Sequence, residues 1–501
     1  MNGSLVAQVA DLLQRAEQRY ADTPPADTLH IARERLREPL RVAIAGKVKA
    51  GKSTLLNALV GEPLAPTDAR ETTRIVTWYR DGLTYRVTLD PVDGPPQQVP
   101  FRRGDGALSV DLDGRDPADV HRLVVEWPSA RLRAMTLIDT PGIASLSTQV
   151  SARTEMFLAP EDRPGEADAV CYLMRHLHAT DARFLEAFAD DDAAGAAPMN
   201  AIGVLSRADE IGVGRLSALE AAGRIARRYR ADPQVRRLCS TVLPVAGLLA
   251  ETGVTLREDE HAALAALISV ERETLNDLLL STDRFVSGDA DIGVGADVRR
   301  ALVQRFGIFG IRVSLALIRS RQAPNATKLA VGLLRRSGVE TLRETLATQF
   351  AARADLLKAR SALAVLSTVL RSSARDDVAD LAGAVEQIVA STHAFAEARL
   401  LNALRAGNVP LDDTAAAEAE RLLGGHGDAP AARLGFDDHE EDDTAPDLTV
   451  LHTAATEALA RWRRRAEHPM ASRATVEAAS LVVRSCEGIV IALRQPSSVE
   501  M

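Results

Sequence analysis

Residues 40–61, LRVAIAGKVKAGKSTLLNALVG, decide the fold of the first half of the chain. Val42 and Ile44 belong to an apolar strand, and Leu55 and Leu59 belong to a helix that follows the turn Gly-x-x-x-x-Gly-Lys-Ser. This strand–loop–helix order is the setting in which that pattern forms a P-loop. The glycines let successive backbone N–H groups point at phosphate oxygens, and the helix adds the positive end of its dipole. The stretch therefore predicts a nucleotide-binding site.

The loop itself supplies the predicted phosphate contacts. We expect Lys52 to reach the β- and γ-phosphates and the Ser53 hydroxyl to bind Mg²⁺ as the cofactor. Lysine is scarce elsewhere in the chain, so the crowding of lysines in this loop also indicates a phosphate partner. The predicted nucleotide-binding residues of the loop are Gly46, Lys47, Val48, Lys49, Ala50, Gly51, Lys52, Ser53 and Thr54.

A second motif, LIDTPG at residues 137–142, ends an apolar strand. Asp139 is predicted to hold a water of the Mg²⁺ shell, and the Gly142 amide is predicted to contact the γ-phosphate. Such a segment is ordered by the triphosphate and relaxes after hydrolysis. Asp-x-x-Gly is common in isolation, but at a strand end and after a P-loop it indicates a nucleotide switch.

A third motif, VLSRAD at residues 204–209, again lies at a strand end. GTPases carry Asn/Thr-Lys-x-Asp at this place in the chain, and the aspartate accepts two hydrogen bonds from guanine. Asp209 fits that role, and Arg207 can replace the lysine because a guanidinium stacks well on flat rings. Ser206 keeps a hydroxyl but departs from the usual Asn or Thr. A helix-capping aspartate is the plain alternative, yet order and position favour guanine over adenine, and therefore GTP as substrate.

Two further contacts are predicted from weaker signals. The strand that ends in PVAG, residues 244–247, should carry the last base-contacting loop, with the backbone amides of Val245 and Ala246 as donors. Between the P-loop and Asp139, a threonine is expected to close on Mg²⁺. Thr73 is preferred and Thr72 is its rival, although either could simply decorate a surface turn.

Composition limits the alternatives. A chain of 501 residues is expected to form two or three domains. The formal net charge of −9 argues against a nucleic-acid binder and gives no bulk attraction to anionic lipid. The three cysteines have no metal or redox spacing, which suits a reducing cytosol. No signal peptide is expected, and the apolar run 306–318 is too short to span a bilayer.

The chain is predicted to divide into three parts. Residues 1–39 read as a helical hairpin that could pack on the nucleotide domain or join the helices of the C-terminal half. Residues 40–260 alternate strand and helix patterns, which predicts an α/β P-loop domain with a mostly parallel sheet and helices on both faces. The stretch 90–117 reads as an irregular surface segment to which no strand or helix is assigned. The predicted strands are 40–45, 74–79, 84–89, 122–127, 135–139, 169–174, 201–205 and 240–245.

From residue 261 to 501 the strand signals almost vanish. Apolar residues three and four positions apart within 378–395 predict a helix packed lengthwise on its neighbours. Several such helices predict an elongated all-α helical bundle, or stalk. Residues 424–446 are rich in Gly and acids, which predicts a flexible acidic linker rather than a metal site. The predicted helices are 299–319, 339–370, 376–404, 448–465 and 473–493.

Together, these motifs and the helical second half resemble the dynamin superfamily. More closely, the chain is similar to the mycobacterial isoniazid-inducible dynamin-like proteins (the IniA/IniC family) in their shorter form. The resemblance covers nearly the whole chain and implies a GTPase head on a helical stalk, head-to-head dimerisation with GTP, and action on membranes. The segments that carry the closer likeness are APTDA at 65–69, TRIVTW at 73–78, SRADEIG at 206–212, DRFV at 283–286 and RFGIFGIR at 305–312.

Hydrolysis is expected to need activation. Ile143 follows the second motif, where Ras-like GTPases place a glutamine that orients the attacking water. The resemblance implies activation by dimerisation across the nucleotide, with P-loop groups or a monovalent cation neutralising charge. At the position of Lys49, dynamins have a serine that helps hold the cation, and guanylate-binding proteins have an arginine finger. Lys49 could therefore supply this charge or be a solvated side chain. The predicted catalytic residues are Lys49, Lys52 and Thr73.

Two functions remain open at this point. In the first, nucleotide-driven dimerisation remodels the plasma membrane, alone or together with a longer dynamin-like paralogue. In the second, the protein is a soluble regulatory or scaffold GTPase whose helical half binds other proteins. The basic run at residues 461–465 could touch lipid, but a solvated helix face is favoured. We expect a cytoplasmic protein, at most peripheral on the inner face of the plasma membrane.

Overall fold

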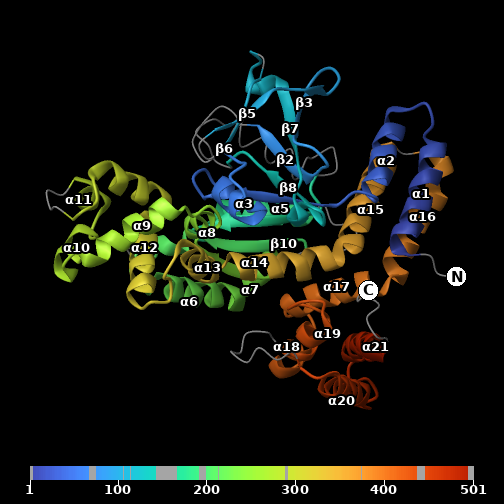
Figure 1. Cartoon of the computed structure of the whole chain (residues 1–501). Coiled ribbons are helices and arrows are strands. Elements are labelled where there is room, and N and C mark those ends of the chain that lie inside the picture. The colour runs from blue at the N-terminus through green and yellow to red at the C-terminus, as the bar shows by residue number, and fades with distance from the viewer. Residues whose placement is uncertain are drawn as a thin grey trace.

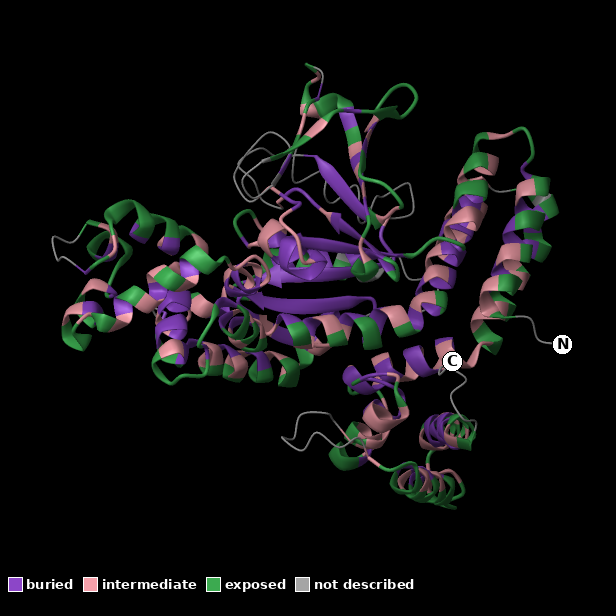
Figure 2. Ribbon diagram, viewed as in Figure 1, coloured by how far each residue is buried: buried purple, intermediate pink, exposed green. Residues whose placement is uncertain are grey.

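The computed structural model describes residues 4–66, 75–104, 107–112, 114–142, 166–190, 199–212, 214–287, 292–373, 375–436 and 446–494. A central β-sheet carries helices on both faces, and further groups of helices extend to either side of it and below it (Figure 1). Figure 2 shows that the central strands are buried, whereas the outer helices bury only one side. The fold is therefore a mostly parallel α/β sheet domain followed by a mostly helical region, as predicted.

The parallel strands place their carboxyl ends along one edge of the sheet. Among the described residues, the main sheet has nine strands in the order β11-β10-β9-β1-β8-β2-β7-β3-β4. The strands from β11 to β8 run parallel, whereas β2 pairs antiparallel with β8. Ligands of such sheets bind outside the carboxyl ends of the strands. The strands are β1 (Leu40–Gly46), β2 (Val76–Asp81), β3 (Arg86–Pro91), β4 (Gln97–Gln98), β7 (Val120–Trp127), β8 (Met135–Asp139), β9 (Ala169–Met174), β10 (Ala201–Ser206) and β11 (Val242–Val245).

Every predicted strand has a counterpart whose ends differ by at most two residues. The unplaced stretch 90–117 contains β4 and a separate hairpin of β5 (Phe101–Gly104) and β6 (Ala107–Val110). This hairpin packs on the segment that follows the P-loop helix, because Leu108 is buried and its N–H donates to the Leu64 carbonyl at 3.1 Å.

Alternating side chains of β1 build a core on each face of the sheet. Val42 and Ile44 pack with Leu55 and Leu342 on one face, and Ala43 and its neighbours pack on the other. This follows from the two-residue period of a strand. The first face is covered by α3 (Lys52–Val60), α8 (Gly247–Val254) and α14 (Val339–Thr345), and the second by α5 (Ala179–Asp190), α6 (Ala218–Ala231) and α7 (Pro233–Leu238).

A cluster of helices after α8 packs beside the sheet. Its core includes Leu249, Phe285, Phe306 and Phe309. Helix α12 is long and apolar enough to cross a membrane by length and composition alone, but half of its most apolar window is buried inside this cluster. The cluster consists of α9 (Glu258–Ala266), α10 (Arg272–Leu278), α11 (Thr282–Ser287), α12 (Ala296–Arg319) and α13 (Ala326–Ser337).

The N-terminal hairpin packs on helices from the second half of the chain (Figure 1). Helices α1 (Leu5–Arg19) and α2 (Pro24–Arg35) share a core with α15 (Ala354–Ser372) and α16 (Ala379–Ser391). One end of this group is tied to the sheet domain, because Arg35 pairs with Asp168 at 3.3 Å. At the same end, the Lys358 ammonium of α15 donates to the Leu36 carbonyl at 2.9 Å and joins α15 to the residue after α2. The hairpin therefore packs along helices of the second half, and its Arg35 end also contacts the sheet domain.

A last cluster contains the C-terminal helices, and here the structure corrects the predicted linker. Residues 424–436 are folded: the Arg353 guanidinium donates to the Gly424 carbonyl, and Arg433 bridges Asp428 and Glu397. Residues 424–436 have the composition of a solvated linker, but they are ordered because their charged side chains pair with one another inside the cluster. Residues 437–445 lie outside the described residues. The helices are α17 (His393–Arg405), α18 (Asp413–Leu422), α19 (Pro430–Leu434), α20 (Leu448–Ala466) and α21 (Arg473–Arg494).

Two helices predicted as continuous are interrupted. The predicted helix 339–370 consists of α14, a π-helical turn at Leu346–Phe350, a 3₁₀ turn at Ala351–Arg353, and α15. The predicted helix 376–404 begins with a short 3₁₀ turn at Asp376–Val378 and breaks at Thr392, whose ψ is 116°. At these breaks the chain passes from one cluster to the next. The apolar periodicity of the sequence continues across each break, which is why the sequence predicted one continuous helix.

Candidate functional site

The P-loop lies at the carboxyl end of β1, between that strand and α3. The Lys52 ammonium is buried and donates to the carbonyls of Gly46 at 3.2 Å and Lys47 at 3.4 Å. Burial lowers the pKa of Lys52, and the Asp139 carboxylate opposes this shift. The loop therefore holds the ammonium on its inner side, close to the next motif of the chain.

Ser53 and Asp139 meet beside the loop. The Ser53 hydroxyl donates to Asp139 Oδ2 at 2.9 Å, while Asp139 Oδ1 is buried and has no hydrogen-bond partner among the described residues. Burial raises the pKa of Asp139, whereas Lys52 and the Ser53 hydroxyl lower it. Carboxylate and hydroxyl oxygens are the donors that Mg²⁺ prefers, so the pair fits this ion. Thr72 and Thr73 lie outside the described residues.

Gly142 lies directly against the P-loop. A Cβ added at Gly142 would be 2.5 Å from Val48 Cγ2 and 2.8 Å from Val48 Cα. Thr140, two residues earlier, is fixed to the sheet because its hydroxyl donates to the Ile44 carbonyl at 3.0 Å. The second motif and the P-loop are therefore in contact, and this contact requires glycine.

The two other lysines of the loop have different surroundings. Lys47 pairs with Asp181 of α5 at 3.2 Å, and the same buried carboxylate accepts from the Tyr172 hydroxyl at 2.7 Å and the His178 N–H at 2.9 Å. Lys49 is exposed, has a φ of 63°, and forms no ion pair with any residue that the structure describes. No sequence pattern marks Asp181, because its role depends on the packing of α5 beside the loop.

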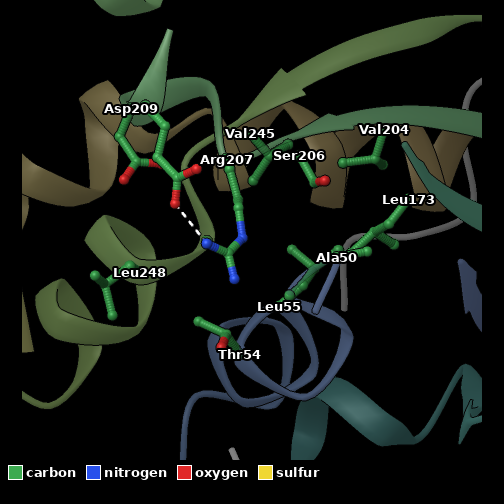
Figure 3. A pocket seen from close by; sticks show the side chains of 13 residues that line it. Ala50, Thr54, Leu55, Leu173, Val204, Ser206, Arg207, Asp209, Val245 and Leu248 are labelled. Carbon is green, nitrogen blue, oxygen red and sulfur yellow. Dashed lines mark hydrogen bonds and ion pairs between the residues drawn. The ribbon is translucent and has the colours of Figure 1, made fainter. Parts of the chain in front are cut away.

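A pocket lies where the P-loop meets the ends of β9, β10 and β11. It contains about 540 Å³ of empty space, part of which opens to solvent. Figure 3 shows Arg207 extending from the end of β10 toward Thr54 on α3, with Leu248 across the pocket. The pocket is lined by Ala50, Gly51, Thr54, Leu55, Leu173, Val204, Ser206, Arg207, Asp209, Glu210, Val245, Gly247 and Leu248.

The polar side of this pocket is the third motif. Burial raises the pKa of Asp209, and Arg207 and Arg175 partly oppose the shift. The Arg207 guanidinium pairs with Glu210 at 2.5 Å, the ion pair drawn as a dashed line in Figure 3. Ser206 is buried, and its hydroxyl donates to the Met174 carbonyl at 3.3 Å rather than into the pocket. The motif thus offers one carboxylate and one guanidinium to a ligand.

The last predicted loop differs at Ala246. The Ala246 N–H donates to the Ser337 carbonyl at 2.8 Å, and Ala246 is fully buried and does not line the pocket. The reason is tertiary: the end of α13 packs over the end of β11 and takes this donor. Val245 does line the pocket, together with Gly247 and Leu248, which the sequence analysis missed. The apolar residues that follow this strand were the available sequence signal for these contacts, because the flat ring of a base packs against apolar side chains.

Comparison with known proteins agrees with this geometry. A family model described as the dynamin family matches residues 42–194. The chain is 43% identical over 456 residues to the isoniazid-induced protein IniC of Mycobacterium tuberculosis, covering 91% of each chain. It is 31% identical over 151 residues to the bacterial dynamin-like protein of Nostoc punctiforme, covering 27% of this chain and 20% of that one. It is 36% identical over 147 residues to the isoniazid-induced protein IniA of Mycobacterium tuberculosis, covering 28% and 22%.

Solved structures of an oligomerised bacterial dynamin pair align with 98% of this chain and 74% of theirs, at 14% identity and a TM-score of 0.31. The 43% sequence identity to IniC over 91% of both chains is enough by itself to assign the family. It shows that this chain belongs to the dynamin-like GTPase family, as a bacterial dynamin-like protein related to IniC.

Proposed function

We propose that the protein binds GTP with Mg²⁺ and hydrolyses it to GDP and phosphate. The observation that carries the proposal is the pocket that joins the P-loop residues Ala50, Gly51 and Thr54 to Asp209. Phosphates would lie along the loop, close to Lys52, and the base would enter the pocket between Arg207 and Leu248. Asp209 would accept the hydrogen bonds of the guanine edge, and the Arg207 stem would cover the ring.

The residues at the phosphate end have separate roles. Ser53 would bind the metal directly, and Asp139 would hold one of its waters through the unpaired oxygen Oδ1. When bound, Mg²⁺ neutralises charge on the β- and γ-phosphates. Lys52 would shift from its carbonyl partners to the phosphates, because a charged acceptor binds an ammonium more strongly than a carbonyl does.

The base assignment is tested with Asp209→Asn. The substitution replaces an acceptor of two hydrogen bonds by an amide, and bonds to a charged group contribute about 1.5–3 kcal/mol each. GDP affinity, measured with a fluorescent analogue, should therefore fall about 10²–10⁴-fold. Affinity for xanthosine diphosphate, which presents an acceptor in place of the amine, should rise. Glu220→Gln, an exposed site on α6, is the control. Unchanged GDP affinity in Asp209→Asn would remove the guanine assignment.

We further propose that GTP-dependent dimerisation through the GTPase domains activates turnover and remodels the plasma membrane, with a second copy or a longer dynamin-like paralogue. The chain would then be cytoplasmic and peripheral on the inner face of that membrane. Membership of the dynamin family supports this proposal, as does Ile143, which cannot orient water. Specific GTPase activity should rise with protein concentration if assembly activates the enzyme. A constant specific activity contradicts activation by assembly.

A second candidate, a soluble regulatory or scaffold GTPase, has its own support. Two arginines of α20 are already paired with acids of neighbouring helices: Arg461 with Glu418 at 2.7 Å and Arg463 with Glu487 at 2.6 Å. Paired arginines give little net attraction to anionic headgroups. Flotation with anionic liposomes, with and without a GTP analogue, separates the two candidates. Flotation supports the membrane function, and GTP-dependent self-assembly without flotation supports the scaffold.

A further inference from the structure

Residues 305–312, RFGIFGIR, have no role in the function proposed so far. They lie in the middle of α12, which packs against α8 beside the guanine pocket. Phe306 and Phe309 are buried in the core of the adjacent helical cluster. The motif is therefore close to the site without lining it, and its other residues show how it contacts the pocket walls.

Gly307 interrupts α12 directly behind Leu248. Its φ of 61° and ψ of 171° are non-helical and belong to a region that essentially only glycine adopts. A Cβ at this position would be 3.5 Å from Leu248 Cδ2, so the kink packs on a residue of the pocket wall. The Thr252 hydroxyl lies within hydrogen-bond reach of the Leu248 carbonyl, at 2.8 Å, and of the Arg305 carbonyl. Helix α8 and the kink are thus fixed to each other.

Arg305 anchors the helix on the side of α8. Its guanidinium donates to Glu260 Oε1 at 2.8 Å, to the Thr255 hydroxyl at 2.9 Å and to the Thr255 carbonyl at 2.9 Å. Thr255 directly follows α8, so Arg305 holds the far end of the helix whose first turn carries Leu248. The first half of the motif therefore determines where one wall of the pocket lies.

Arg312 holds the opposite wall. Its guanidinium donates to the Gly214 carbonyl at 2.7 Å and to the Leu279 carbonyl at 2.9 Å. Gly214 comes a few residues after Arg207 and Asp209 in the sequence. A Cβ on Gly214 would lie 3.7 Å from both the Asp209 carbonyl oxygen and Phe309 Cβ, so Gly214 lies between the loop of Asp209 and α12. A planar guanidinium presents its donors in a fixed fork, so two carbonyls at set positions are held more rigidly than by a lysine.

We propose that RFGIFGIR is a positioning element for base recognition. Through Gly307 and Arg305 it sets Leu248, and through Arg312 and Phe309 it sets the loop of Asp209, so it fixes the separation of the two walls between which the purine binds. The inference rests on the proposed binding of guanine nucleotides. It predicts that the motif controls discrimination between bases and leaves the phosphate contacts of the P-loop unchanged.

The test compares Arg312→Ala, Arg312→Lys and the matched control Arg319→Ala, an exposed arginine at the end of the same helix. Affinities are measured for GDP, for inosine diphosphate, which lacks the amine that Asp209 would recognise, and for pyrophosphate. A displaced Asp209 would lose or weaken one of its two hydrogen bonds to guanine, so GDP affinity of Arg312→Ala should fall about 10- to 100-fold. Inosine diphosphate should lose much less, pyrophosphate should be unaffected, and Arg312→Lys should recover part of the preference.

Equal losses for all three ligands would mean a general structural role and would overturn the proposal, as would a GDP preference equal to that of the unmodified protein. Circular dichroism first establishes that each variant is folded. If Arg312→Ala does not fold, Arg312→Lys and Gly307→Ala give the same readout, because Gly307→Ala strains the kink and removes no side-chain contact. An unmodified protein that binds no GDP rejects the proposed function, whereas normal binding with unaffected variants rejects this inference alone.

Discussion

Gly142→Ala probes the contact between the second motif and the P-loop. The new Cβ would lie 2.8 Å from Val48 Cα and 3.0 Å from Val48 N, whereas ordinary contacts of this kind begin at 3.4 Å. The Val48 side chain can rotate away, but its backbone cannot, so the loop must move by roughly 0.6 Å to restore van der Waals separation. The substitution therefore displaces the phosphate-binding backbone without removing any polar group.

The size of the effect follows from that displacement. Misplacement by about 1 Å costs up to roughly 10²-fold in a precisely positioned site, so we predict a loss of about 10- to 100-fold in kcat/KM for GTP. This loss corresponds to about 1.4–2.7 kcal/mol of transition-state stabilisation. Most of it should already be visible as weaker GDP binding, because the displaced loop contacts the phosphates in both nucleotides.

The assay combines GTP turnover, titration with a fluorescent GDP analogue and thermal unfolding. Gly488→Ala is the matched control, since this exposed glycine of α21 has no atom within 4 Å of an added Cβ. Alanine in a helix interior is favoured over glycine by about 1 kcal/mol, so the control should be as stable as the unmodified protein or more so. Turnover and GDP affinity of Gly142→Ala within twofold of the unmodified protein would refute the reasoning, because the loop would then tolerate the methyl group without moving.

Three further predictions concern single side chains. If Lys49 supplies positive charge to the transition state, Lys49→Ala should keep GDP affinity but lower the assembly-stimulated kcat at least about tenfold. This loss is smaller than the roughly 10³–10⁵-fold effect of an arginine finger, because a lysine lacks the bidentate fork. An unchanged stimulated kcat, or a potassium requirement in the unmodified protein, rejects this role of Lys49. Asp181→Asn should destabilise the fold to urea by roughly 1–3 kcal/mol, because the amide has no charge to pair with Lys47 and only one oxygen to accept from the three donors Tyr172, His178 and Lys47. The exposed Asp11→Asn should have almost no effect, and equal midpoints would contradict the prediction. Burial alone would raise the pKa of Glu397, but the His393 hydrogen bond and Arg433 lower it from 4.5 to about 2. Its stabilisation should therefore be complete above about pH 4.5 and be lost as the pH falls toward 2, and Glu397→Gln should flatten acid unfolding in this range, monitored by intrinsic fluorescence.

The sequence by itself determined the elements whose signals are local. A P-loop needs only neighbouring residues in order, so the run from Val42 to Ser53 predicted a strand, a turn and a helix that the structure contains. Strand ends were placed within two residues because β-strands of a buried sheet are short apolar runs between turns. The motifs at Asp139 and Asp209 lie at the same edge of the sheet, because each follows a parallel strand and parallel strands bring their carboxyl ends to one edge.

Only the tertiary structure decided which distant residues meet. Nothing near Asp181 or Arg312 in the sequence indicates that one would pair with Lys47 and the other hold Gly214, because these contacts depend on how α5 and α12 pack. The same holds for the Ala246 amide, which packing assigns to Ser337 instead of a nucleotide. Periodicity reports which face of a helix is buried but not what covers it. The choice of partners is made by the free energy of the packed whole, and local sequence patterns carry little of that information.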